Sequence, residues 1–193
     1  MKKIFYIYIC IALLSITSLG IVLAAFTYKN KYVGSTFTIG SAVIKLFQDL
    51  TGGPEPSNLT DELPGPAFQN ISDGWQFDYP IKIFNSGSTR INLSSRANYT
   101  TVNDPDNLRD IIYVEIFEWN DSNFNGIFDL EEKGTSLYAP KTILRWKNDG
   151  IQMGQIDSGQ TRSYLLSFST PSVTDSKQGK TGLFDFEFDS LSL

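Results

Sequence analysis

The last strand-like segment of the chain constrains its fold most. Between Leu183 and Asp189, three phenylalanines alternate strictly with acidic residues: Phe184, Phe186 and Phe188 are separated by Asp185, Glu187 and Asp189. A period of two is typical of a β-strand with one face in a hydrophobic core and the other face in water. A helix would scatter these phenylalanines around its axis, so the segment predicts a strand whose phenylalanines face the core of an all-β domain.

The same period recurs along the chain. In Ser41–Phe47 the apolar residues Ala42, Ile44 and Leu46 share one face. In Trp75–Phe84 one face holds Trp75, Phe77, Tyr79, Ile81 and Ile83, and the turn cluster Asn85–Ser88 follows. We expect further strands through Ile91 and Leu93 and at Ile111–Trp119, Thr142–Trp146 and Tyr164–Phe168.

This pattern predicts seven to nine short strands in one domain, residues 35–193. Such a set, with turn signals between strands, favours an antiparallel β-sandwich of jelly-roll or Greek-key type. We expect no amphipathic helix after the N-terminal region, only a short turn near Asn107–Asp110. The Gly- and Pro-rich segment Thr51–Pro66 is interpreted as a long connection within the domain.

The N-terminus indicates export. Lys2 and Lys3 precede an apolar run, and Val22 and Ala24 supply the small residues of a signal peptidase site. We therefore predict a signal peptide at residues 1–24, a secreted product and only transient contact with a membrane. The alternative is an uncleaved anchor, because residues 4–26 are uncharged and long enough to span a bilayer.

Composition excludes several function classes. The 16 basic residues are outnumbered by 21 acidic ones, giving a net charge of −5, so no basic surface for nucleic acid is expected. Histidine is absent, the single cysteine (Cys10) lies in the predicted signal, and no G-x-S-x-G motif occurs. We predict a protein without enzymatic activity and without catalytic residues.

The most specific local motif runs from Asp121 to Glu132. It matches the calcium-loop pattern D-x-[DN]-x-[DN]-G-x₅-E at every position. Calcium prefers six to eight oxygen ligands, and this spacing offers them from side chains and one carbonyl. The candidate ligands are Asp121, Asn123, Asn125, Ile127, Asp129 and Glu132. A strand and not a helix precedes the loop, so we predict a strand–loop calcium site rather than an EF-hand. The ion's role would be structural. The alternative is a polar hairpin loop, because Asn, Asp and Gly also favour turns.

N-glycosylation sequons are another candidate feature. N-x-[ST] occurs at Asn120, beside the calcium-type loop, and at four further candidate sites: Asn58, Asn70, Asn92 and Asn98. In a host that glycosylates exported proteins these sites would carry sugars; otherwise they are polar positions on strands and loops.

Motifs just after the predicted cleavage site resemble a known family. Ala24–Tyr28, Ser35–Gly40 and Val43–Leu46, with weaker similarity at Leu63–Gly65, Ile83–Ser88 and the last strand, resemble the TasA/camelysin family. Its members carry a SipW-type signal peptide and build biofilm-matrix fibres; the archaeal bundling pili are related. The resemblance implies a jelly-roll subunit of an extracellular filament. The metalloprotease activity described for some camelysin relatives is not carried over, because this chain has no histidine.

The resemblance also implies how copies join. In such fibres the N-terminal segment of one subunit pairs as a strand with the next, and here that donor strand would be Ala25–Tyr32, within a free segment of residues 25–34. Phe26 and Tyr28 alternate with Thr27 and Lys29, and Asn30 and Lys31 follow, so one face is apolar enough to fill a groove. The alternatives are pairing within its own sheet, or a loose stub.

We therefore expect a homopolymer that assembles head to tail and is stabilised by structural calcium. The competing hypothesis is a monomeric calcium-binding adhesin, held at the membrane by residues 4–26.

Overall fold

The described part of the chain is a two-layered β-structure. The computed structural model describes residues 36–39, 44–65 and 71–192, all within one compact unit that begins at Val33. These residues form eleven strands: β1 (Thr36–Ile39), β2 (Ile44–Phe47), β3 (Leu59–Thr60), β4 (Glu62–Pro64), β5 (Trp75–Asn85), β6 (Ile91–Asn98), β7 (Tyr113–Trp119), β8 (Lys133–Thr142), β9 (Ile151–Ile156), β10 (Thr161–Thr170) and β11 (Asp185–Ser192). The all-β prediction is confirmed.

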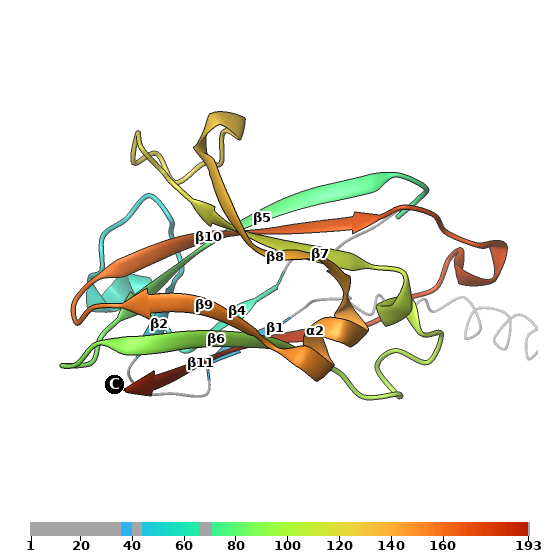
Figure 1. Cartoon of the computed structure of the whole chain (residues 1–193), viewed down its shortest axis with the longest axis horizontal. Helices are drawn as coiled ribbons and strands as arrows, with labels where there is room; N and C mark the ends of the chain where they lie inside the picture. The colour runs from blue at the N-terminus through green and yellow to red at the C-terminus, as the bar shows by residue number, and fades with distance from the viewer. Residues whose placement is uncertain (1–35, 40–43, 66–70, 193) are drawn as a thin grey trace, which may run out of the picture. The chain divides into compact units, whose positions relative to one another are not determined.

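The strands divide between two sheets. One has the order β4-β1-β11-β6-β9 and the other the order β3-β2-β5-β10-β7-β8. In Figure 1 the layer with β5 and β10 lies over the layer with β6 and β11. Every pairing is antiparallel except that of β1 with β11, which is parallel. The structure thus departs from the purely antiparallel sandwich that the sequence pattern predicts. The pattern could not reveal the parallel pair, because β1 and β11 lie 146 or more residues apart in the sequence.

The prediction that the phenylalanines of the last strand face the core is confirmed. Phe184, Phe186 and Phe188 are at most 5 % exposed. Phe186 reaches across the sandwich to Phe168 of β10, with ring centroids 5.4 Å apart, and stacks on Trp146 at 4.8 Å. Burial of such aromatic side chains, at about 25 cal/mol per Å², is the main force that holds the two sheets together.

The predicted apolar face of β5 is only half in the core. Ile81 and Ile83 are buried, but Phe77 is 42 % exposed. The rings of Trp75, Phe77 and Tyr79 instead follow one another along the strand, with centroids 6.4 and 6.5 Å apart. Periodicity correctly gives the face on which these rings lie. It does not say how far along the strand the facing sheet extends, so the expectation of a core position for Phe77 is wrong.

The predicted strand at Thr142–Trp146 is wrong, and so is the expectation that no amphipathic helix is present. Strand β8 ends at Thr142, and Ile143–Asp149 form the short helix α2. The side-chain oxygen of Thr142 caps the helix by accepting a hydrogen bond from the Arg145 N–H at 3.3 Å. Ile143 and Trp146, three residues apart, are buried on one helical face. Two buried apolar residues are enough to anchor one helical turn to the core. In so short a segment, the spacing of apolar residues does not distinguish a helix from a strand.

The connections hold more structure than the pattern predicts. The segment Thr51–Pro66 contains the 3-10 turn η1 (Pro56–Asn58) and the short strands β3 and β4. The predicted turn near Asn107–Asp110 is confirmed as η2 (Leu108–Asp110). Two further 3-10 turns are η3 (Leu130–Glu132) and η4 (Asp175–Lys177). Among the described residues no helix has the length and apolar character needed to cross a membrane.

Candidate calcium loop and the hollow beside it

The predicted calcium loop is the connection of the β7–β8 hairpin. The end of β7 pairs with the start of β8 through Trp119 and Lys133, so residues 120–132 project from one end of the hairpin. Within the loop, the Asn123 side-chain oxygen accepts from the Asn125 N–H at 2.9 Å, and the Asn125 side-chain oxygen accepts from Ile127 N–H at 2.8 Å. Alternate Asn side chains therefore turn inward and fold the backbone around them.

Gly126 fixes the position of this loop against a second one. Its φ of +67° is in the left-handed region, and its N–H donates to Asp121 Oδ2 at 3.3 Å. A Cβ at this position would lie 2.6 Å from the backbone of Leu50 and Thr51. Both the dihedral angle and the close approach require glycine, so the loop docks on the Leu50–Thr51 peptide.

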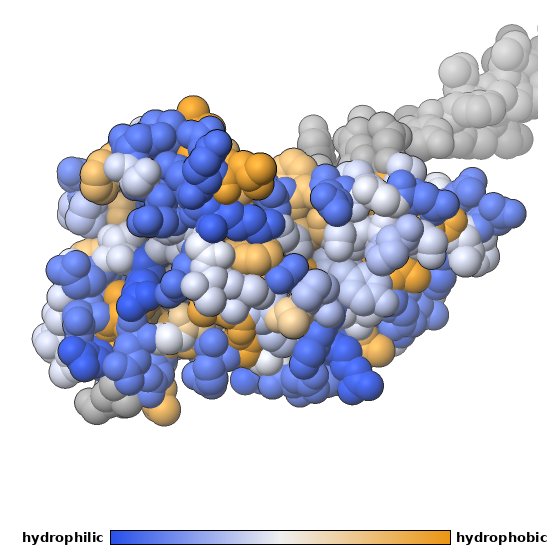
Figure 2. All heavy atoms as spheres, turned by 45° about the horizontal axis from the view of Figure 1, so that its top comes forward, coloured by the Kyte–Doolittle hydropathy of each residue, from blue (hydrophilic) through white to orange (hydrophobic). Residues whose placement is uncertain are grey.

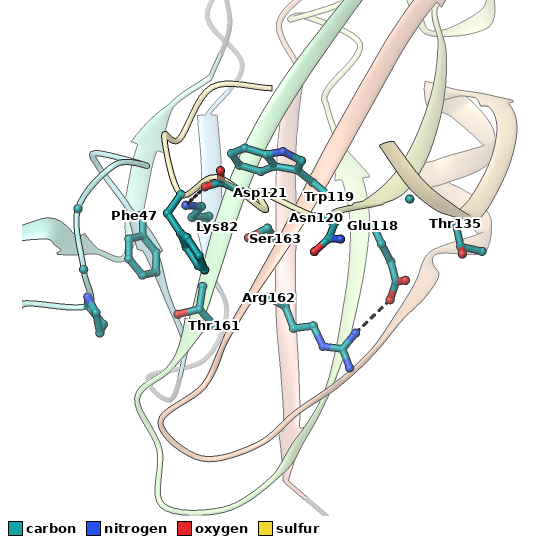
Figure 3. A pocket seen from close by; sticks show the side chains of 15 residues that line it. Phe47, Lys82, Glu118, Trp119, Asn120, Asp121, Thr135, Thr161, Arg162 and Ser163 are labelled. Carbon is teal, nitrogen blue, oxygen red and sulfur yellow. Dashed lines mark hydrogen bonds and ion pairs between the residues drawn. The ribbon is translucent and has the colours of Figure 1, made fainter. Parts of the chain in front are cut away.

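Asp121 and Glu132 are the two candidate ligands whose charged side chains are buried. The Asp121 side chain is 4 % exposed and pairs with Lys82, whose Nζ lies 2.6 Å from Asp121 Oδ2 and 2.6 Å from the Leu50 carbonyl oxygen. Figure 3 shows Lys82 directed at Asp121 beside Trp119. The second oxygen, Asp121 Oδ1, is buried and has no hydrogen-bond partner among the described residues. A buried carboxylate oxygen without a partner is costly, and a cation would relieve that cost.

The motif predicts Glu132 as a calcium ligand, but in this structure its carboxylate binds groups of the protein itself. Glu132 is 5 % exposed, and its carboxylate accepts hydrogen bonds from the Trp119 indole N–H at 3.0 Å, Ser122 N–H at 3.2 Å and Asp129 N–H at 3.3 Å. Both of its oxygens are therefore engaged by the protein. In this structure Glu132 closes the loop as a hydrogen-bond acceptor for three donors.

The remaining candidate ligands lie toward solvent. Asp129 is exposed and accepts from the Asn123 amide at 3.4 Å, and the Ile127 side chain points outward, 64 % exposed. Within the described ranges, no three His, Cys, Asp or Glu side chains gather closely enough to hold a metal ion. The calcium site therefore stays a prediction.

A hollow of about 700 Å³ adjoins the loop (Figure 3). Lys82, Trp119 and Asp121 form one wall, and Gly52, Gly53 and Pro54 belong to another part of its lining. The charges in it are paired: Arg162 NH1 lies 3.0 Å from Glu118 Oε1 on the neighbouring strand. The sequence places Lys82 on the polar face of β5, but its pairing with Asp121 could not be read from the pattern, since 39 residues separate them.

No protein-family model and no curated protein matches this chain. Its role is therefore inferred from its own residues.

The sequons differ in how firmly the fold holds their asparagines. The Asn58 amide donates to the carbonyl oxygens of Asp49 (2.9 Å) and Gly53 (3.0 Å), and the Asn98 amide donates to Glu187 Oε1 at 2.7 Å. A glycan replaces one of the two amide hydrogens, so Asn58 could not keep both of its bonds and Asn98 would have to keep its bond with the single hydrogen left. Asn92 is the second residue of β6 and is half-buried. Asn70 and the predicted donor strand, Ala25–Tyr32, lie outside the described residues.

Proposed function

We propose that this chain is the structural subunit of an extracellular filament, in which Ala25–Tyr32 of one copy pair as a β-strand with the next copy. The observation that supports this most is where the sandwich begins. The first strand of the described sandwich, β1, starts at Thr36, and three residues separate it from the predicted donor strand in the sequence. A segment that precedes the first strand of a sandwich can pair with a neighbouring copy, and strand addition gives main-chain hydrogen bonds as well as side-chain contacts.

The connectivity favours a jelly-roll subunit. From β5 onward the chain crosses between the two sheets at every step except the β7–β8 hairpin. Repeated crossing between two layers is typical of the jelly-roll and Greek-key folds. We place the protein outside the cell, on the strength of the predicted signal peptide.

Deleting Ala25–Lys31 tests the proposal. We expect the variant to keep its far-UV circular dichroism and melting transition but to form no filaments by electron microscopy, because the donated strand joins copies and not the two sheets of one copy. A variant that unfolds would place this strand in its own domain. A variant that still polymerises would remove the strand from the assembly.

The alternative function is a membrane-anchored monomeric adhesin. Whether the N-terminus is cleaved distinguishes it from the filament subunit. Mass spectrometry of the cell-surface protein should find Ala25 as the first residue. An intact N-terminus in the membrane fraction, with no filaments, would favour the adhesin and contradict the filament proposal.

We propose further that the Asp121–Glu132 loop binds calcium as a structural ion. Asp121, Asn123 and Asn125 would hold it together with the Ile127 carbonyl. Asp129 and Glu132 would complete the ligand set, and Glu132 would then exchange internal hydrogen bonds for the ion. The buried, unpartnered Asp121 Oδ1 supports this assignment. The ion would supply positive charge to neutralise the loop carboxylates and would rigidify the loop.

Thermal unfolding with calcium or with a chelator tests the calcium site. Calcium at 100 times its Kd should stabilise the protein by about 2.7 kcal/mol, which raises Tm by about 5–10 °C. The double variant Asp121→Ala/Glu132→Ala should lose this increment, whereas Asp110→Ala, an acid outside the loop, should keep it. An equal increment in both variants, or none in the unmodified protein, would reject the site.

A further inference from the structure

The end of the β7–β8 hairpin presents an apolar tip. Phe124, Ile127 and Leu130 are 82, 64 and 75 % exposed. They are three of the six large apolar side chains that lie exposed among the described residues, and they fall within seven positions of one loop. Figure 2, in which this end of the molecule comes forward, shows hydrophobic surface next to strongly hydrophilic surface there. We call Phe124, Ile127 and Leu130 the hairpin tip.

The backbone of the tip is strained at Phe124. Its φ is +56°, in the left-handed region that favours Gly or Asn. Holding a non-glycine residue there costs about 1–3 kcal/mol. With 82 % of its surface exposed, the Phe124 side chain recovers little of this by burial in its own domain. A strained and exposed aromatic residue is better explained by a contact with another molecule.

The tip is acidic as well as apolar. Residues 120–132 include no Lys or Arg. Asp129 and Glu131 are exposed, and no ion pair within the described residues involves either of them. Loops that insert into membranes combine apolar side chains with basic residues that attract anionic lipid. This tip carries negative charge instead, which suits a basic protein surface. A recess in that surface would take up the apolar side chains.

The opposite end of the same hairpin offers such a surface. A hollow of about 510 Å³ is lined by Tyr113, Pro140, Lys141, Thr142, Arg145 and Asp149. Lys141 pairs with Asp149 at 3.6 Å, while Arg145 is exposed and forms no ion pair with a described residue. One positive charge is therefore left over beside an aromatic ring and a proline. We call this recess the base hollow.

The hairpin places the tip and the hollow at opposite ends. Tyr113 pairs with Thr142 at the base, and Trp119 pairs with Lys133 next to the tip. Seven residues of β7 separate the ends by about 20 Å, at 3.3 Å per residue. A contact between the tip of one copy and the base hollow of another is heterologous, so it repeats in one direction and does not have to close.

We propose that the hairpin tip of one copy docks in the base hollow of the next, with Glu131 facing Arg145. This inference rests on the proposed filament and adds to it a second contact, which sets the direction in which copies stack. A tip of three side chains buries far less than the roughly 800 Å² per partner of a stable interface. The contact is therefore effective only between copies that the donor strand already holds together.

Charge reversal tests the contact. Glu131→Arg places like charges at every tip–hollow junction, and so does Arg145→Glu, so each variant alone should polymerise with a critical concentration raised about tenfold or more. Mixed in equal amounts, the two variants should assemble as an alternating copolymer near the unmodified concentration, because each tip then meets a hollow of opposite charge. Glu62→Arg and Arg96→Glu, exposed residues on strands β4 and β6 of the other sheet, serve as controls and should polymerise normally.

Two outcomes would overturn the proposal: single variants that polymerise like the unmodified protein, or a mixture that assembles no better than either variant alone. The apolar part has its own test, in which Phe124→Ser weakens assembly and Val102→Ser, equally exposed elsewhere, does not. If Phe124→Ser instead abolishes co-sedimentation with anionic vesicles and leaves polymerisation unchanged, the tip serves a bilayer and the proposal is wrong.

Disulfide trapping separates this contact from the proposed function. Glu131→Cys and Arg145→Cys variants are mixed and oxidised, with Glu62→Cys and Arg145→Cys as the control mixture. Because oxidation captures even short-lived encounters, a covalent dimer only in the first mixture supports the tip–hollow contact, even if the unmodified protein forms no filament and the donor-strand proposal fails. Absence of the dimer in protein that does form filaments would reject the contact alone.

Discussion

At the scale of single residues, the loop of the β7–β8 hairpin is held by a few positions that tolerate little change. Gly126 combines a left-handed φ with an approach of 2.6 Å to a neighbouring backbone, and Lys82 joins the loop to Leu50 through a nearly buried ammonium. These contacts tie the 121–132 loop to the loop that follows β2. The two loops therefore hold each other in place.

Gly126→Ala should destabilise the protein by about 2–4 kcal/mol, because the added methyl group meets backbone and the φ is unfavourable. Gly159→Ala is the matched control: its φ is +71°, but no atom lies within 4 Å of the added carbon. It should lose only about 1 kcal/mol. Urea denaturation of both variants measures the difference, and equal losses would show that strain alone matters at Gly126.

Asp49 provides a pH-dependent contact at the same scale. The Thr51 backbone N–H and then the Thr51 hydroxyl donate to its carboxylate, and together they lower the pKa of Asp49 below its ordinary value. A lowered folded-state pKa stabilises the fold above the ordinary value near 4 and loses this contribution as the pH falls through the folded pKa. We expect the protection of the Thr51 amide against hydrogen exchange to fall only below about pH 4, while Asp49→Asn should abolish this step. A step at higher pH would assign it to another group.

At the scale of elements, α2 shows how a short segment takes its conformation from its ends. Thr142 caps the first turn, Gly150 with a φ of +60° ends the helix, and its N–H donates to the Trp146 carbonyl. Between them, Trp146 is fully buried against Phe186. The helix thus covers one end of the core, although its own seven residues are too few to be helical in isolation.

Thr142→Ala should cost about 1 kcal/mol through loss of the N-cap, and Trp146→Ala should cost about 3–5 kcal/mol through loss of core packing. Thr142→Ser, which keeps the capping oxygen, should be close to neutral. Chemical denaturation with tryptophan fluorescence checks the Thr142 variants, and circular dichroism checks Trp146→Ala. A Thr142→Ser loss as large as that of Thr142→Ala would assign the effect to the methyl group.

At the scale of the whole molecule, Phe186 links the parts of the sandwich. It belongs to β11, packs on Phe168 in the opposite sheet and stacks on Trp146 of α2. Three elements from distant parts of the sequence meet at one ring. Stability of the sandwich should therefore depend strongly on this residue and hardly at all on aromatic residues at the surface.

Phe186→Ala should destabilise the fold by about 3–5 kcal/mol. Phe124→Ala, which removes a ring that is 82 % exposed, should leave stability unchanged or raise it slightly. Guanidinium unfolding of both variants measures this contrast. A Phe124→Ala loss close to that of Phe186→Ala would mean that the tip packs within its own domain, which would also weaken the docking proposal.

The sequence by itself determined the all-β class, the buried faces of β2 and β11, and the loop at the end of β7, because alternation and turn residues act over a few neighbouring positions. It also singled out Asp121 and Glu132 as special. Only the tertiary structure decided that Glu132 is occupied by three internal donors, that Lys82 neutralises Asp121, and that Phe77 lies largely outside the core. These depend on which segments meet across the fold, and sheet pairing between distant strands leaves no local trace in the sequence. The same reason applies to the hairpin: its loop stands out in the sequence but its base does not, and only the β7–β8 register places the tip and the base hollow at opposite ends of one hairpin.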